Sequence, residues 1–323
     1  MNTERRAVID IGTNSVKLLV GDVAGPRVDP VFETGIQTRL GRGLYETGRL
    51  GSESIQATLA AVRRLLELAA GHGAPSIRLL ATSAVREAAN GPHLVADIEA
   101  LAGHCVHVIS GETEAALAFQ GVRTDARLNR CPQLILEVGG GSTQWILRRT
   151  ADDHDRGSLA LGAVRLFEAL RPGDPPSDAD RHRCEAQLEE CLPRCLGPIL
   201  APALTGGAAR GVDLVGTGGT SSVLAMIWLE IDVFDRERIE STPLPQGSVR
   251  RVHERLWALP IEARRRLAGL PPDRADIVLT GVAIYESVMR VFGFGQLHCS
   301  TRGVRFGALL VDPHNDADRG DRL

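Results

Sequence analysis

The chain has 323 residues, 43% of them hydrophobic and 24% charged, so it is long enough for two ordinary globular domains. Its formal charge of −3 argues against a broad basic surface for nucleic acid. The six cysteines lack the spacing of zinc sites. No uncharged stretch is long enough to cross a bilayer and no apolar signal segment opens the chain, so we expect a cytoplasmic protein without membrane partners.

The first half of the chain alternates strands with helices. A strand at 7–11, a tight turn and a strand ending at 20 are followed by a strand at 28–37 and a flexible basic loop at 38–43. Apolar residues spaced by three and four positions predict a helix that starts at a Ser52 cap. Further strands are expected at 77–81 and 106–109, with helices at 84–89 and 92–102. This alternation is typical of an α/β layered domain.

The second half repeats this opening. Strands are expected at 134–138, 142–149 and 157–161, followed by helices at 163–170 and 177–196. A strand then enters a third glycine-rich turn at 216–220 and a helix. Prolines interrupt a helical region at 245–292. The chain ends with a strand at 296–299, a helix at 302–311 and a polar tail that we expect to be disordered.

Two strand-turn-strand segments match at a constant offset, which is 137 − 10 = 127 positions from Asp10 to Glu137. Each has an acid near the end of its first strand and a hydroxyl after the turn. A single glycine turn is usually just a hairpin, but two in register point to phosphate, because glycines let backbone N–H groups converge on an anion. The predicted phosphate-binding residues are Gly12, Thr13, Asn14, Ser15, Gly139, Gly140, Gly141, Ser142 and Thr143.

Two α/β domains that each begin with such a turn resemble the sugar kinase, heat-shock ATPase and actin superfamily. The resemblance implies two ribonuclease H-like (actin-like ATPase) domains with an interdomain cleft as the binding site. We expect residues 1–124 together with a C-terminal helical segment at 302–323 to form the first, phosphatase-like domain. Residues 125–301 are expected to form the second.

Several motifs narrow this resemblance. The segments Ile109–Ala116, Ala81–Asn90, Leu159–Leu166, Arg274–Ile277 and Arg302–Gly307 are similar, in this order, to motifs of the exopolyphosphatase and guanosine pentaphosphate phosphohydrolase (Ppx/GppA) family. The similarity runs from about Ala7 to Leu310, and the chain resembles the short two-domain form of that family. The resemblance implies a hydrolase of phosphoanhydride bonds that acts on polyphosphate or guanosine pentaphosphate, and a homodimer.

The resemblance also implies roles for individual residues. Glu114 aligns with a catalytic glutamate that activates water, and Arg86 with an arginine that contacts the phosphate chain. The two turns would hold the terminal phosphates, with Mg²⁺ as the cofactor and Asp10 and Glu137 as its ligands. Candidate substrate contacts are Lys17, Arg39, Gly218 and Arg274.

Each of these residues also has a purely structural interpretation. Glu114 is equally consistent with a solvated carboxylate in the first turn of a helix, where Glu112 would serve as well. Arg86 and Arg165 are also consistent with surface ion pairs, and Arg274 with a contact at a helix start.

Three positions depart from the family pattern. Glu137 stands where relatives usually have Asp, which lengthens the arm of a metal ligand. Gln144 stands where they usually have Glu, which removes a charge near the metal. Phe306 replaces a glutamate of the C-terminal motif, and we expect that change to affect packing.

The leading hypothesis is a Mg²⁺-dependent exopolyphosphatase, with guanosine pentaphosphate as a second substrate. Glu137 and Gln144 also favour an alternative, a weak or inactive relative that binds polyphosphate or an alarmone as a sensor. A kinase of the same superfamily is a third hypothesis, but no sugar-kinase acceptor motif is recognisable in the sequence.

Overall fold

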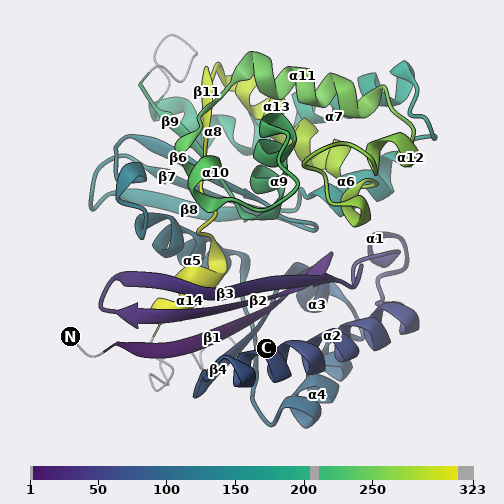
Figure 1. The fold of residues 1–323 in the computed structure, drawn as a ribbon. Helices are drawn as coiled ribbons and strands as arrows, with labels where there is room; N and C mark the ends of the chain where they lie inside the picture. Colours follow the sequence, from purple (N-terminus) through teal and green to yellow (C-terminus); the bar gives the residue numbers. More distant parts are fainter. Residues whose placement is uncertain (1–2, 204–210, 312–323) are drawn as a thin grey trace. The chain divides into compact units, whose positions relative to one another are not determined.

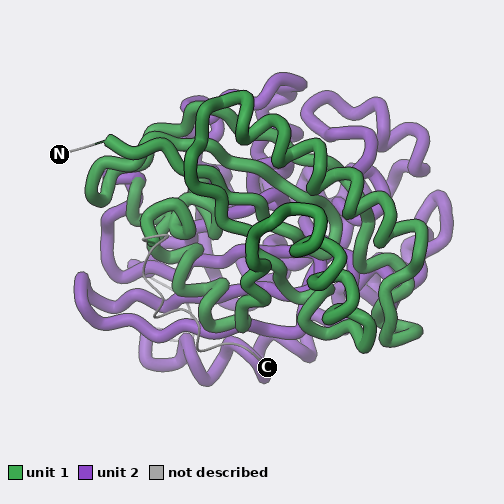
Figure 2. Tube along the Cα trace, turned by 90° about the horizontal axis from the view of Figure 1, so that it is seen from below, with its two compact units in different colours: residues 1–124, 302–323 green, residues 125–301 purple. Residues whose placement is uncertain are grey.

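The structure is a computed structural model that describes residues 3–203 and 211–311. The chain divides into two compact units, coloured separately in Figure 2. Unit 1 contains Met1–Thr124 and Arg302–Leu323, and unit 2 contains Asp125–Thr301. No helix in the described ranges is both long and apolar enough to cross a membrane. The polar tail expected to be disordered lies outside the described residues.

Unit 1 is built around a sheet that, in the described part of the chain, has five strands in the order β3-β2-β1-β4-β5 (Figure 1). Strands β1 to β3 form an antiparallel meander, while β4 and β5 run parallel to β1. Its strands are β1 (Glu4–Ile11), β2 (Ser15–Ala24), β3 (Arg27–Gln37), β4 (Ser76–Ala81) and β5 (Val106–Val108). Its helices are α1 (Leu44–Thr47), α2 (Ser52–Gly71), α3 (Ser83–Glu87), α4 (Gly91–Ala102), α5 (Gly111–Arg123) and α14 (Val304–Leu310).

The two faces of this sheet are covered by different helices. Side chains alternate along β1, so Ala7, Ile9 and Ile11 join the core formed with α2 and α4. Figure 1 shows α5 and α14 on the opposite side of the sheet, where α14 contacts β1 and β2. Asp10 belongs to that second face, because its neighbours in sequence point toward α2.

Unit 2 has a sheet of six strands among the described residues, in the order β10-β11-β9-β6-β7-β8 (Figure 1). Its strands are β6 (Gln133–Val138), β7 (Thr143–Arg148), β8 (His154–Leu159), β9 (Asp213–Thr217), β10 (Leu244–Pro245) and β11 (Gln296–Cys299). Its helices are α6 (Ala163–Leu170), α7 (Asp178–Cys195), α8 (Gly197–Leu200), α9 (Gly218–Leu229), α10 (Arg236–Ser241), α11 (Gln246–Trp257), α12 (Ile261–Arg264) and α13 (Val278–Phe292), with 3-10 turns at Ala126–Leu128, Ala201–Ala203 and Pro272–Arg274. Side chains of α7, α9, α11 and α13 form its largest core.

The repeat seen in the sequence is a repeat of structure. In the β1–β2 pair Asp10 lies opposite Lys17, and in the β6–β7 pair Glu137 lies opposite Gln144. Both turns close with the same hydrogen bond. The N–H of Gly12 donates to the Ser15 carbonyl at 3.1 Å, and that of Gly139 to the Ser142 carbonyl at 2.9 Å. The offset of 127 positions therefore relates two hairpins of identical register.

Three local predictions differ from the structure. Ser52 does not cap α2; it is the first helical residue, and the N-cap is Gly51, whose backbone is extended. The basic loop at 38–43, expected to be flexible, is hydrogen-bonded to the first turn, because the N–H groups of Thr38 and Arg39 donate to the Asn14 carbonyl. The helix expected at 302–311 is shorter, from Val304 to Leu310. Phe306 is buried in that helix, with Arg302 over its ring.

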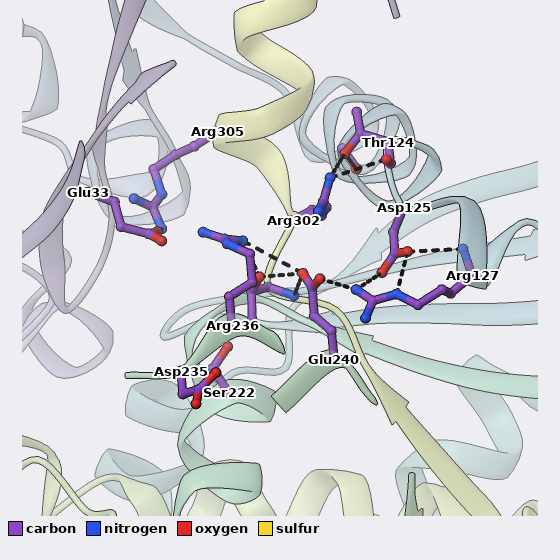
Figure 3. Close-up of polar contacts among 12 residues, drawn as sticks. Glu33, Thr124, Asp125, Arg127, Ser222, Asp235, Arg236, Glu240, Arg302 and Arg305 are labelled. Carbon is purple, nitrogen blue, oxygen red and sulfur yellow. Dashed lines mark hydrogen bonds and ion pairs between the residues drawn. The ribbon is translucent and has the colours of Figure 1, made fainter. Parts of the chain in front are cut away.

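A buried carboxylate ties together the two ends of unit 2 (Figure 3). Glu240 on α10 accepts a hydrogen bond from Arg127 and another from the Thr301 hydroxyl at 2.5 Å. Arg127 also pairs with Asp125 at 2.9 Å. Asp125 and Thr301 are the first and last residues of unit 2, so α10 holds both points at which the chain enters and leaves it. No pattern in the sequence predicts that α10 lies there.

His253 on α11 is a buried titratable group of the unit 2 core, 2% exposed, with its ring edge-on to Trp257. Burial lowers the pKa of His253 from 6.5 to about 4, and the charges of Arg181 and Arg290 act in the same direction. The folded chain therefore holds this imidazole neutral at pH values where the unfolded chain protonates it.

Acidification should therefore destabilise unit 2 through His253. Since its pKa is depressed on folding, the stabilisation is complete above about pH 6.5 and is lost as the pH falls toward 4. The free energy of unfolding should fall by about 2 kcal/mol between about pH 7 and pH 5, and a His253→Leu variant should lack that part of the pH dependence. Urea unfolding followed by tryptophan fluorescence measures this, because all three tryptophans lie in unit 2. Equal slopes for both proteins would contradict it.

Candidate functional site

The glycine turn of unit 1 is held by its carbonyl groups. The Thr13 carbonyl accepts from the N–H of Gly41 at 2.7 Å, and the Asn14 carbonyl accepts from Thr38 and Arg39 at 3.1 and 3.0 Å. In a trans peptide the N–H points away from the C=O. Fixing these two carbonyls therefore turns the following N–H groups, those of Asn14 and Ser15, to the opposite side of the turn.

The turn of unit 2 is held in the same way, by the start of α6. The Gly139 carbonyl accepts from Ala163 at 2.9 Å, and the Gly140 carbonyl accepts from Val164 and Arg165 at 2.8 and 3.1 Å. The Arg165 side chain donates from Nε to the Gly141 carbonyl at 2.8 Å. Three consecutive carbonyls are thereby bound, so the three N–H groups that follow them face away from α6. Such convergent N–H groups form an anion-binding concavity.

Two glycines outside the turns make this anchoring possible. A Cβ at Gly41 would lie 2.3 Å from Thr13 Cγ2, and a Cβ at Gly162 would lie 2.4 Å from the Gly140 oxygen. Thr143, predicted to bind phosphate, directs its hydroxyl to the Leu161 carbonyl at 2.6 Å. That hydroxyl fixes the segment that leads into Gly162, so its role in this structure is to support the turn.

Glu114 and Arg86 come together in unit 1. Arg86 Nη1 lies 3.7 Å from Glu114 Oε2 and donates to the Ile109 carbonyl at 2.6 Å. Glu114 lies in the first turn of α5, which is capped by the Ser110 hydroxyl, and is only 9% exposed. Glu112 in the same turn is exposed. The alternative of a solvated carboxylate therefore fits Glu112 and does not fit Glu114.

Asp10 carries the acidic group of the first turn. Burial raises its pKa, and the nearby charges of Lys17 and Arg305 oppose that rise. Arg305 on α14 donates to the Leu18 carbonyl at 2.9 Å and lies 3.5 Å from Glu33. Arg305 was not among the predicted site residues. The only sequence feature that pointed to Arg305 was its place in the motif Arg302–Gly307. That motif does not predict which strand Arg305 contacts.

Glu137 and Arg274 meet at the start of α9 in unit 2. A Cβ at Gly218, whose φ is +82°, would lie 2.9 Å from Glu137 Cγ, and a Cβ at Gly219 would lie 2.6 Å from Arg274 Nη1. Only glycines allow both side chains to approach this backbone so closely. The structure therefore brings Glu137, Gly218 and Arg274 to the same place, as neighbours of the second turn.

The described ranges contain no cluster of three or more His, Cys, Asp or Glu side chains that would hold a metal by itself. They do contain buried oxygen atoms suited to a hard cation. Asp10 Oδ1 and Gln144 Oε1 are buried and accept no hydrogen bond from the described residues. Gln144 is fixed by its Nε2, which donates to the hydroxyls of Ser142 and Ser158. Carboxylate and amide oxygens are ligands that Mg²⁺ accepts, so these residues fit it.

In each unit the predicted residues gather at one edge of the sheet. Asp10 lies near the carboxyl end of β1, and Arg86 and Glu114 lie on helices that follow β4 and β5, which run parallel to it. In unit 2, Glu137 lies near the end of β6, and Gly218 follows the parallel strand β9. Ligands of open α/β sheets bind at the carboxyl ends of parallel strands. Each unit thus presents one set of anion-binding and acidic groups.

Comparison with known proteins identifies the family of the chain. A model of the Ppx/GppA phosphatase family matches residues 19–315. Exopolyphosphatase 2 of Mycobacterium tuberculosis is 32% identical, with 96% of this chain and 99% of that protein aligned. Exopolyphosphatase 1 of Mycobacterium bovis is 27% identical over 97% and 90% of the two chains.

Solved structures show the same fold. An exopolyphosphatase from Cytophaga hutchinsonii has a TM-score of 0.83 at 25% identity, over 95% of this chain and 96% of that chain. The Aquifex aeolicus PPX-GPPA enzyme has a TM-score of 0.76 at 26% identity, over 96% and 100% of the chains. The predicted fold class, two actin-like ATPase domains of α/β type, is confirmed. The chain belongs to the Ppx/GppA phosphatase family and is a hydrolase.

Substituting Gly162→Ala should damage the second turn. Gly162 has an extended backbone that any residue adopts, so only the contact of the added Cβ with the Gly140 oxygen matters. We expect a loss of about 1–3 kcal/mol in the free energy of unfolding and weaker binding of inorganic phosphate. Urea unfolding and calorimetry measure the two effects. Gly197→Ala is the control, because nothing lies within 4 Å of its Cβ position, and similar behaviour of both variants would refute the role of Gly162.

Proposed function

We propose that this chain is an exopolyphosphatase that releases terminal phosphate from inorganic polyphosphate. The observation that carries the proposal is the buried carboxylate of Glu114 next to Arg86, at the sheet edge that also bears the first glycine turn. Relatives that cover nearly the whole chain are exopolyphosphatases, which supports the choice of substrate.

Glu114 acts as the general base in this proposal. It accepts a proton from the water that attacks the terminal phosphorus, a role that typically contributes roughly 100- to 10,000-fold in rate. Arg86 is held by the Ile109 carbonyl, so its guanidinium is fixed beside Glu114 before substrate arrives. The Arg86 guanidinium contacts the terminal phosphate. Its positive charge offsets the negative charge of that phosphate, which would otherwise repel the Glu114 carboxylate.

The glycine turns bind phosphate groups through their N–H groups. Since phosphoryl transfer needs little covalent chemistry from the protein, positioning and charge stabilisation account for most of the catalysis. Asp10 and Glu137 are the carboxylates proposed to bind Mg²⁺, directly or through water, and Gln144 adds a neutral oxygen. When bound, Mg²⁺ neutralises charge on the phosphate oxygens.

Guanosine pentaphosphate is proposed as a second substrate, because it ends in the same phosphoanhydride. We propose that contacts with Lys17, Arg39 and Arg274 distinguish guanosine pentaphosphate from polyphosphate. The cytoplasmic location and the homodimer remain predictions from the sequence. The binding-only sensor remains the alternative, and the neutral Gln144 is the observation that favours it.

Replacing the base should abolish turnover. Glu114→Gln removes the proton acceptor but keeps the shape, so release of phosphate from polyphosphate of defined length should fall by at least about 100-fold. Glu112→Gln is the matched control, because this exposed residue lies in the same helical turn, and it should retain wild-type activity. Phosphate release with and without Mg²⁺ gives the measurement.

The outcome separates the two functions. Mg²⁺-dependent release that is lost in Glu114→Gln and kept in Glu112→Gln establishes the exopolyphosphatase. If wild type and Glu114→Gln bind polyphosphate equally well and neither releases phosphate from it or from guanosine pentaphosphate, the sensor is the correct function.

Restoring a charge at position 144 should strengthen metal binding. Gln144 is fully buried, so Gln144→Glu should cost about 1–3 kcal/mol of stability without metal, because a buried carboxylate lacks compensation. Mg²⁺ should restore this stability, and half-saturation should occur at a roughly tenfold lower Mg²⁺ concentration, which corresponds to about 1.4 kcal/mol. Thermal unfolding with and without Mg²⁺, in the absence of substrate, measures both. Equal stabilisation of wild type and variant by Mg²⁺ would exclude Gln144 from the metal site.

A further inference from the structure

The third carbonyl of each turn is held by an arginine, but by different parts of it. These carbonyls belong to Asn14 and Gly141, which the offset relates as 14 + 127 = 141. In unit 1 the donors are the main-chain N–H groups of Arg39, whose φ of +50° is in the left-handed region, and of its neighbour Thr38. In unit 2 the donor is the side-chain Nε of Arg165. The restraint is therefore built into the backbone in one unit and depends on a side chain in the other.

The composition of the two turns explains why the peptide units of the second turn need an additional restraint. The first turn reads Gly12-Thr13-Asn14, and the second reads Gly139-Gly140-Gly141. Glycine populates positive φ about as readily as negative φ, so its peptide units rotate at little cost. A rotated peptide between Gly141 and Ser142 would present its carbonyl oxygen where the N–H now points. That oxygen would repel a phosphate group.

Arg165 is well placed to prevent this rotation. Its own N–H donates to the Gly140 carbonyl at 3.1 Å while its Nε donates to the Gly141 carbonyl, so one residue holds two consecutive peptide units. The helix that carries it is itself anchored, because the Thr280 hydroxyl on α13 donates to the Ala163 carbonyl at 2.7 Å. The surface ion pair considered for Arg165 from the sequence does not describe these contacts.

We propose that Arg165 is a positioning residue for phosphate binding. Its guanidinium holds the Gly141 carbonyl against α6 and thereby keeps the Ser142 N–H aimed at the phosphate chain. The inference rests on the proposed function of the second turn as a phosphate-binding element. It adds a role that the catalytic pair Glu114 and Arg86 does not have, because Arg165 acts through the backbone and not through contact with the reacting atoms.

The test compares three variants with wild type. Arg165→Met keeps the length and removes the donor, Arg165→Lys keeps a donor, and Arg149→Met is a control that removes an arginine from exposed ion pairs in the same unit. We expect Arg165→Met to raise KM for defined polyphosphate and the Kd for pyrophosphate by between about 10- and 100-fold, since the loss of one hydrogen bond to a charged phosphate weakens binding by about this factor. Its kcat should change less, its Tm should stay close to that of Arg149→Met, and Arg165→Lys should recover part of the affinity.

A second readout distinguishes positioning from general support of the fold. In an Arg165→Ala variant, millimolar guanidinium should restore part of the lost affinity, because the free ion can donate to the same carbonyl, whereas it should not improve Arg149→Met. Unchanged KM and Kd in Arg165→Met would overturn the inference. The inference would also be overturned if the Tm of Arg165→Met fell far enough to explain its lost affinity and neither the lysine variant nor guanidinium corrected that fall. Failure of wild type to bind polyphosphate or pyrophosphate would instead overturn the proposed function, and the inference with it.

Discussion

The hydrogen bonds that hold the carbonyl groups of the two glycine turns are the constraint on which the anion-binding edge of each unit depends. A glycine turn has no preferred direction for its N–H groups until its carbonyls are bound. Segment 38–41 binds them in unit 1, and the first residues of α6 bind them in unit 2. Two unrelated structural elements thus perform the same task, and this is why Gly41 and Gly162 have no room for a side chain.

The duplicated hairpins differ most in charge. Opposite the acid of each first strand stands Lys17 in unit 1 and Gln144 in unit 2. Burial raises the pKa of Asp10, and the charges of the lysine and of Arg305 oppose that rise without cancelling it. The amide adds no charge beside Glu137 and instead presents a buried oxygen. The acid of the first edge therefore has cations of the protein nearby, whereas the acid of the second edge has a neutral amide opposite it.

Burial decides which carboxylate of α5 is chemically important. Glu112 and Glu114 share the helix start and its favourable dipole, so charge patterning alone does not separate them. The folded unit buries Glu114 and leaves Glu112 exposed. Arg86 reaches Glu114 from α3, 28 positions earlier in the sequence by 114 − 86, because both helices begin at the same sheet edge.

The sequence by itself determined the α/β class, the family and the repeat at an offset of 127, because strand periodicity, glycine turns and motif order are local properties that a chain displays before it folds. It did not determine the anchoring of the turns by Gly41 and Arg165, the meeting of Glu137 with Gly218, or the contact of Glu240 on α10 with Thr301. These contacts join residues far apart in the chain, and only tertiary packing selects which of many compatible donors and acceptors become neighbours. For the same reason, Arg165 was open to interpretation as a surface ion pair until the fold placed its guanidinium on a carbonyl of the second turn.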